Sequence, residues 1–280
     1  MPDRLDRAVY RDIVRRAISE DIGPGDVTTW AVVPSNAKAT ATLLAKTTCV
    51  VAGLDIAREV FEQVDATLEF VASKSDGNLC HSGEPLARIV GRAASILSAE
   101  RTAVNFVQHL SGIATLTRRY VDATGGALTV LDTRKTVPTL RSLAKYAVRC
   151  GGGTNHRSGL YDGVLIKDNH IRLAGGVTEA VRRVRASGSM LSIEVEAQSL
   201  PEVDEALEAK ADVIMLDNLD DTTMREAVRR IAGRAKVEIS GGVSLERIRI
   251  LAMMGADYVS VGALTHSAVA ADISLEIESQ

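Results

Sequence analysis

The sequence predicts an α/β protein made of a small sheet-containing domain and an incomplete α/β barrel. From residue 127 onward the chain repeats one plan, in which an apolar strand is followed by a turn and a helix. Between residues 39 and 93, short segments rich in β-branched residues alternate with turn sequences. A chain of 280 residues with 46% hydrophobic residues is long enough to hold both parts. For the repeated part, a doubly wound open sheet is the alternative to a barrel.

The N-terminal part begins with a predicted amphipathic helix over residues 4–20, where apolar residues recur at four-residue spacing. The small sheet follows over residues 39–93. A long helix is predicted over residues 95–123, and Gly125 and Gly126 end it. We therefore expect a first domain over residues 1–115, a barrel domain over 116–268, and a tail over 269–280 that returns to the first domain.

Six apolar segments in the second part are predicted strands. Helical patterns separate several of them, which favours parallel pairing through right-handed crossovers. A complete barrel of this type has eight strands, so six predict an incomplete one. The segments are LTVLD, GVLIK, LSIEVE, DVIMLD, VEIS and YVSVG.

Composition argues against nucleic-acid and membrane partners. The net charge is −3, and the chain has one Trp and three Phe, too few for base-stacking platforms or an interfacial aromatic belt. The first twenty residues are charged and lack an apolar signal core, and the three cysteines form no CxxC pair. A cytoplasmic protein is expected.

Each predicted strand ends in, or is directly followed by, a residue that can serve a site. In α/β barrels the carboxyl ends of the strands carry the active site. A single acid or serine at such a position is commonly a helix cap, but six such residues together favour a site. They are Asp132, Lys167, Glu196, Asp217, Ser240 and Gly262.

The segment 133–172 is strongly cationic, with eight Lys or Arg residues against two acids. Arg141, Lys145 and Arg149 lie at four-residue spacing, which is typical of a solvated helix face. The remaining candidates lie in turns or at strand ends, where they could present several donors to one small polyanion. These are Arg134, Lys135, His156, Arg157 and Lys167.

Two further sets of residues suggest ligands. Glu196 and Asp217 could hold a divalent cation such as Mg²⁺ through hard carboxylate oxygens, and pairing with the nearby cations without a metal is the alternative. Two glycine-bearing strand ends could bind phosphate through backbone N–H groups. These phosphate candidates are Ser240, Gly241, Gly242, Gly262 and His266.

The chain resembles the quinolinate phosphoribosyltransferase family. The resemblance runs from EDIGPGDVTT near the start to His266 and rests on ERTAVNFVQHLSGIAT, on the stretch from LDTRKT through GGGTNHR to IKDNH, on ISGGV and on VGALTHS. It departs from the family at Thr139, where glycine is common, and at Ala144, where an acid often stands.

The resemblance implies an N-terminal α/β sandwich joined to an incomplete α/β barrel, in a homodimer whose active sites are shared across the interface. It implies Mg²⁺-dependent transfer of a phosphoribosyl group from phosphoribosyl pyrophosphate to the ring nitrogen of quinolinate with decarboxylation. The products are nicotinate mononucleotide, pyrophosphate and carbon dioxide.

The resemblance also assigns roles to individual residues. Quinolinate would meet Arg134, His156, Arg157 and Lys167, with Lys135 nearby and Arg101 reaching in from the partner subunit. Glu196 and Asp217 would face the ribose and the metal-bound pyrophosphate, and the phosphate candidates would bind the 5-phosphate. The hypotheses that compete are a molybdenum-transport-associated paralogue, a Schiff-base aldolase that uses Lys167 and, least favoured, an RNA-binding module.

Overall fold

The computed structural model describes residues 3–279, which form two compact units. The first unit contains the chain up to Arg118, the segment Thr136–Gly152 and the chain from Leu264 onward. The second unit contains Arg119–Lys135 and Gly153–Ala263. The first unit is therefore assembled from three stretches of sequence and the second from two.

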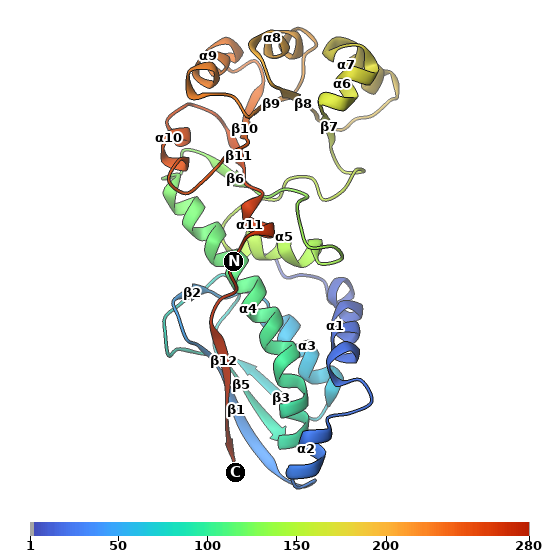
Figure 1. Cartoon of the computed structure of the whole chain (residues 1–280), viewed down its shortest axis with the longest axis vertical. Helices are drawn as coiled ribbons and strands as arrows, with labels where there is room; N and C mark the ends of the chain where they lie inside the picture. The colour runs from blue at the N-terminus through green and yellow to red at the C-terminus, as the bar shows by residue number, and fades with distance from the viewer. Residues whose placement is uncertain (1–2, 280) are drawn as a thin grey trace. The chain divides into compact units, whose positions relative to one another are not determined.

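A four-stranded antiparallel sheet forms the base of the first unit (Figure 1). Along β1, buried side chains alternate with more exposed ones because successive side chains point to opposite faces. The last strand of the chain pairs with β1, the first. In spatial order the strands are β12 (Ile273–Ser279), β1 (Lys38–Ala45), β5 (Pro85–Arg92) and β3 (Glu69–Ala72).

Helices and a two-stranded ribbon complete this unit. The predicted helices over 4–20 and 95–123 are confirmed as α1 and α4. The core includes Leu43 of β1, Phe61 of α3 and Ile89 of β5, all fully buried. The elements are α1 (Arg7–Ile22), α2 (Val27–Val32), β2 (Cys49–Val50), α3 (Leu54–Val64), β4 (Leu79–Cys80), α4 (Ala93–Ala123, to Arg118 in this unit), α5 (Arg141–Cys150) and α11 (Ala263–His266, from Leu264).

Helix α5 corrects one expectation. The spacing of Arg141, Lys145 and Arg149 predicted a solvated face, yet the Lys145 residue is only 3% exposed. Most of the helix is buried, including Leu143 and Tyr146. Charge spacing alone cannot show that a helix is enclosed on nearly all sides, so this prediction was wrong.

The turn before α5 holds Thr139 in a left-handed backbone conformation, with φ of 68°. Left-handed backbone is strained for residues with a Cβ, and more so for a β-branched one. We expect Thr139→Gly to stabilise the protein by about 0.5–1 kcal/mol, because relief of strain exceeds the added chain entropy of glycine. Urea unfolding followed by circular dichroism measures the change.

Thr139→Ala is the matched control, since alanine keeps the Cβ that causes the strain. The Thr139 side chain is exposed, so neither substitution removes core packing. Equal stabilisation by alanine and glycine would contradict the strain explanation.

The second unit contains a six-stranded parallel sheet (Figure 1). All six predicted strands are present, in the order expected of a barrel that is open between β6 and β7. This confirms the incomplete α/β barrel. In spatial order they are β6 (Thr129–Leu131), β11 (Tyr258–Ser260), β10 (Lys236–Ser240), β9 (Val213–Asp217), β8 (Ile193–Ala197) and β7 (Val164–Ile166).

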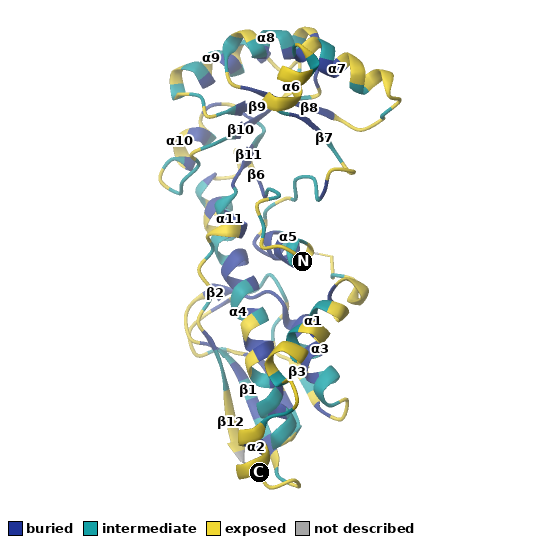
Figure 2. Cartoon of the chain, turned by 45° about the vertical axis from the view of Figure 1, so that its right-hand side comes forward, coloured by how far each residue is buried: buried dark blue, intermediate teal, exposed yellow. Residues whose placement is uncertain are grey.

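Helices follow the strands along the chain, with α7, α8 and α9 on the outer side of the sheet (Figure 1). Figure 2 shows buried strands and exposed outer helix surfaces in this unit, and β8 is buried at every position. The helices are α6 (Asp168–Ala174), α7 (Val177–Ala186), α8 (Leu200–Glu208), α9 (Asp221–Ile231) and α10 (Ile248–Ala252).

No helix within residues 3–279 combines the length and apolar character of a membrane span.

Candidate active site

A cavity of about 460 Å³ lies at the carboxyl ends of the strands in the second unit. The parallel strands bring their ends to one edge, so residues far apart in sequence meet there. Ten of the predicted site residues line this cavity. They are Arg134, Lys135, His156, Arg157, Lys167, Glu196, Asp217, Ser240, Gly241 and Gly242.

Four predicted residues are not among those that line the cavity, namely Asp132, Gly262, Arg101 and His266. The Asp132 side chain, directly after β6, is fully buried. Gly262 lies in the second unit, two positions after Ser260, which does line it. Arg101 and His266 belong to the first unit. The Arg101 side chain on α4 is 60% exposed, and its Nη2 lies 4.0 Å from Glu100 Oε1.

One wall of the cavity is cationic and contains Arg134 and Arg157. Burial, and then the neighbouring Arg134, lower the pKa of Arg157. Its Nη1 donates to the carbonyl oxygen of Gly163 at 3.2 Å, but its buried Nε has no acceptor. A buried N–H donor that lacks an acceptor is costly, so this Nε is suited to an anionic ligand.

The facing strand ends supply carboxylates. Lys167 Nζ forms an ion pair with Glu196 Oε2, and the Glu196 residue is only 7% exposed. Asp217 accepts a hydrogen bond from the Asn218 side-chain amide at 2.9 Å. Within residues 3–279 no third His, Cys or acid converges with Glu196 and Asp217. Two carboxylates of this kind fit Mg²⁺, which usually retains water and substrate phosphate oxygens as ligands.

The turn after β10 requires glycine. Gly241 has φ of 88°, and a Cβ there would lie 2.1 Å from Asn218 Oδ1. Asn218 is itself in the left-handed region and donates its backbone N–H to the carbonyl oxygen of Ser240 at 3.1 Å. The two strand ends are thus packed backbone against backbone at the cavity, where a ligand can approach main-chain N–H groups.

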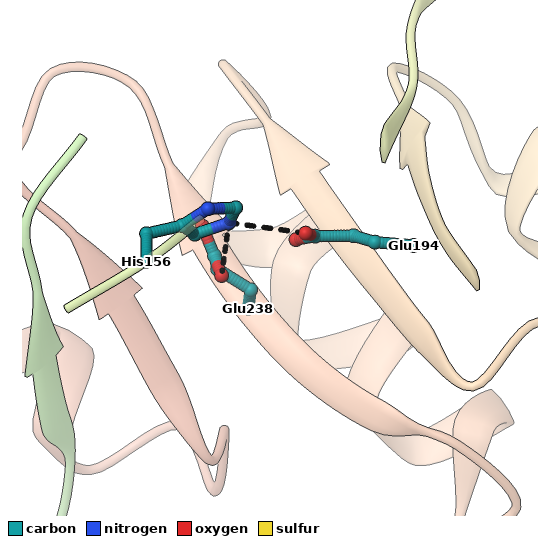
Figure 3. A group of neighbouring side chains, drawn as sticks. All are labelled: His156, Glu194 and Glu238. Atoms are coloured by element: carbon teal, nitrogen blue, oxygen red, sulfur yellow. Dashed lines mark hydrogen bonds and ion pairs between the residues drawn. The ribbon is translucent and has the colours of Figure 1, made fainter. Parts of the chain in front are cut away.

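Beneath the residues at the strand ends lies a second layer of side chains, two positions earlier in each strand. In this layer Glu194 of β8 and Glu238 of β10 converge on the ring of His156 (Figure 3). His156 Nε2 lies 3.0 Å from Glu194 Oε2 and 3.6 Å from Glu238 Oε2. Both glutamates are buried, at 8% and 1% exposure, and each leaves its Oε1 without a partner.

Burial, followed by the nearby Glu194 carboxylate, raises the pKa of Glu238, while His156 opposes the shift. The folded protein therefore keeps a proton on Glu238 at pH values where the unfolded chain has lost it. Stability consequently falls as pH rises above the ordinary carboxyl range, and the loss stops once the folded protein also releases the proton.

Glu238→Gln is expected to flatten this dependence because glutamine does not titrate. Relative to the unaltered protein, the variant should gain at least about 1 kcal/mol in the free energy of unfolding between about pH 5 and about pH 8. Urea midpoints measured across this range test the prediction. Parallel curves for the two proteins would contradict it.

Comparisons with known proteins agree with this geometry. Residues 26–111 match the model of the quinolinate phosphoribosyl transferase N-terminal domain, and residues 113–276 match that of its C-terminal domain. The chain belongs to the quinolinate phosphoribosyltransferase family. The match covers both the sheet domain and the barrel, as the motif resemblance implied.

Individual relatives of the quinolinate phosphoribosyltransferase family cover nearly the whole chain. A probable nicotinate-nucleotide pyrophosphorylase (carboxylating) of Bacillus subtilis is 44% identical, and the match covers 92% of this chain and 90% of that protein. The corresponding protein of Mycobacterium leprae is also 44% identical, with 95% and 96% covered. The crystal structure of NadC from Streptococcus pyogenes superposes with a TM-score of 0.96 at 40% identity, covering 99% of both chains.

Sequence reasoning did not single out Glu238 for this quinolinate phosphoribosyltransferase site. The available signal was the strand alternation, which places Glu238 two residues before Ser240, as Glu194 stands two residues before Glu196. An acid at an inward position of an otherwise apolar strand indicates a buried charge that must have a partner.

Proposed function

We propose that this chain transfers the phosphoribosyl group of phosphoribosyl pyrophosphate to the ring nitrogen of quinolinate and removes one carboxylate as carbon dioxide. The proposal is supported by family membership and by one observation in particular. This observation is the cationic wall of the cavity, where the buried Arg157 Nε lacks an acceptor. A ligand with two adjacent carboxylates can supply acceptors to several such donors at once.

The binding roles follow from position in the cavity. Arg134, Arg157 and Lys167 would hold the two carboxylates of quinolinate, with Lys135 beside them. Arginine forks can contact carboxylates through two parallel hydrogen bonds, while lysines act as point charges. The clustered cations also attract the anionic substrates before reaction.

In the first chemical step, the lone pair of the pyridine nitrogen forms a bond to the anomeric carbon. The bond from that carbon to pyrophosphate breaks, and its electron pair leaves on the pyrophosphate oxygen. Positive charge develops on the ribose as the bond breaks, and Glu196 and Asp217, which line the cavity, would stabilise it. No protein nucleophile is required, which removes the reason to give Lys167 a Schiff-base role.

In the second step, the ring nitrogen is cationic and accepts electron density from the adjacent carbon. The bond to the neighbouring carboxylate breaks, carbon dioxide leaves, and the electron pair remains on the ring carbon. That carbon then takes a proton. Lys135 and Lys167 are the candidate donors, because lysine can act as a general acid and both residues line the cavity.

We also propose that Mg²⁺ takes part, held by Asp217 and Glu196 together with substrate oxygens. When bound, the ion would neutralise charge on the departing pyrophosphate. Ser240, Gly241 and Gly242, with Gly262, would hold the 5-phosphate. The helices after the two glycine loops are short, Ile248–Ala252 and Ala263–His266, so the backbone N–H groups of the loops would carry this role.

A homodimer completes the proposal. Arg101, exposed on α4, would enter the active site of the partner subunit and add a further cation for quinolinate. The family resemblance supports this assignment. Sedimentation of the purified protein tests it, since a fully active monomer would contradict a shared site.

The deciding experiment supplies the purified protein with quinolinate, phosphoribosyl pyrophosphate and Mg²⁺ and follows nicotinate mononucleotide and carbon dioxide. Nicotinate serves as the parallel substrate, because it lacks the second carboxylate. We expect product from quinolinate and little from nicotinate. Activity with neither substrate would overturn the proposal and favour the molybdenum-transport-associated paralogue.

A further inference from the structure

The ring of His156 is fully engaged by the protein, although the residue lines the cavity. Its Nδ1 accepts a hydrogen bond from the backbone N–H of Arg157 at 2.8 Å. An acceptor nitrogen carries no proton, so the proton of the neutral ring is on Nε2. That nitrogen points toward Glu194 and Glu238, with Glu194 the nearer at 3.0 Å (Figure 3).

This tautomer excludes a metal ion at the cluster. A metal bound to Nε2 needs the lone pair of that nitrogen and leaves the ring proton on Nδ1. A proton on Nδ1 would collide with the N–H of Arg157, which already points at it. The three groups therefore form a hydrogen-bonded unit, in which Glu194 is the main acceptor of the Nε2 proton.

The main chain around His156 is fixed as well. Asp132, fully buried at the end of β6, accepts the backbone N–H of His156 at 2.8 Å and the side-chain amide of Asn155 at 2.6 Å. Main-chain hydrogen bonds also join Thr154 to this strand end. The main chain before Arg157 is therefore bound to the end of β6, and the Arg157 backbone N–H is bound to the His156 ring.

We infer that His156 is a positioning residue, locked by Glu194 and Glu238 so that its Nδ1 holds the Arg157 backbone and aims the Arg157 guanidinium into the cavity. The inference rests on the proposed function only for the identity of the ligand. It gives His156 a task other than direct donation to quinolinate, because Nδ1 and Nε2 both have partners within the protein.

The first test needs no substrate. Nitrogen-15 NMR of the imidazole rings distinguishes a protonated Nε2 from a protonated Nδ1 and from a doubly protonated ring. His156→Asn assigns the signal among the five histidines. We expect the neutral Nε2–H form in the free protein and after quinolinate is added. An Nδ1–H or doubly protonated ring in the free protein, or a change of ring partner on binding, would overturn the inference.

The second test separates hydrogen bonding from charge at Glu194. Glu194→Leu removes the acceptor, and Glu194→Gln removes the charge but keeps an acceptor oxygen. We expect Glu194→Leu to raise KM for quinolinate about tenfold, because one charged contact, that of Arg157 with the ligand, would be misplaced. The kcat and the KM for phosphoribosyl pyrophosphate should stay nearly unchanged. Glu194→Gln should restore KM to within about threefold.

Glu59→Gln is the matched control. Glu59 is also buried, at 2% exposure, but it pairs with Arg7 in the first unit. We expect that variant to lose stability without a change in KM for quinolinate. Equal effects of leucine and glutamine at position 194, or an equal loss of kcat with unchanged KM, would refute the positioning role. If the unaltered protein fails to bind quinolinate, the proposed function fails, while the NMR result still decides the state of His156.

Discussion

Replacing Arg157 with alanine is expected to lower kcat/KM for quinolinate by about a hundredfold or more, chiefly through KM. In the proposed site the variant would lose a charge-assisted contact to a carboxylate, a loss of about 2–4 kcal/mol in comparable sites. It also removes a cation that lies beside Arg134 in the wall of the cavity. Steady-state kinetics with quinolinate as the varied substrate, at saturating phosphoribosyl pyrophosphate, measures the effect.

Two companion variants sharpen this prediction. Arg157→Lys keeps a positive charge but loses the planar fork, so it should recover only part of the affinity. Arg225→Ala, at an exposed position on α9, should leave the kinetics unchanged. Full activity of Arg157→Ala would mean that this wall does not contact the carboxylates.

The Asp217→Asn substitution is expected to lower kcat about a hundredfold and to raise the Mg²⁺ concentration needed for half-maximal activity about tenfold. Asparagine keeps the shape and the hydrogen bonding of the side chain but removes the charge that would stabilise the ribose and help to hold the ion. A Mg²⁺ titration at fixed phosphoribosyl pyrophosphate measures both effects.

Glu208→Gln, exposed at the end of α8, is the control for loss of one negative charge and should behave like the unaltered protein. The titration also distinguishes the two explanations for the acidic residues. If kcat falls while the Mg²⁺ requirement stays the same, Asp217 acts on the ribose and does not help to hold the metal.

Strand periodicity predicted much of the barrel and many of the residues that line its cavity. Lys167, Glu196, Asp217 and Ser240 lie at strand ends, and parallel pairing brings all four to one cavity. This success has a simple physical basis, because a parallel sheet gathers the carboxyl ends of its strands whatever the details of packing. The family resemblance then predicted the identity of the substrate, which the positions of residues at strand ends do not reveal.

What the sequence could not provide depends on long-range packing. Glu238 and Glu194 come from strands that are not neighbours, and their convergence on His156 requires the curvature of the whole sheet. The burial of Lys145 likewise depends on what encloses α5. The role of the His156 ring nitrogens depends on a hydrogen bond to the next residue, which side-chain spacing does not encode.

The pairing of β12 with β1 has a consequence for synthesis on the ribosome. Strand β1 is made before the barrel, whereas its neighbour on one side, Ile273–Ser279, is made after the barrel. Until then one edge of β1 offers unpaired N–H and C=O groups, the kind of edge that invites association with other chains. By contrast, most of the barrel is one continuous stretch, Gly153–Ala263. The edge of β1 in the nascent chain is therefore covered only after the whole barrel has been made.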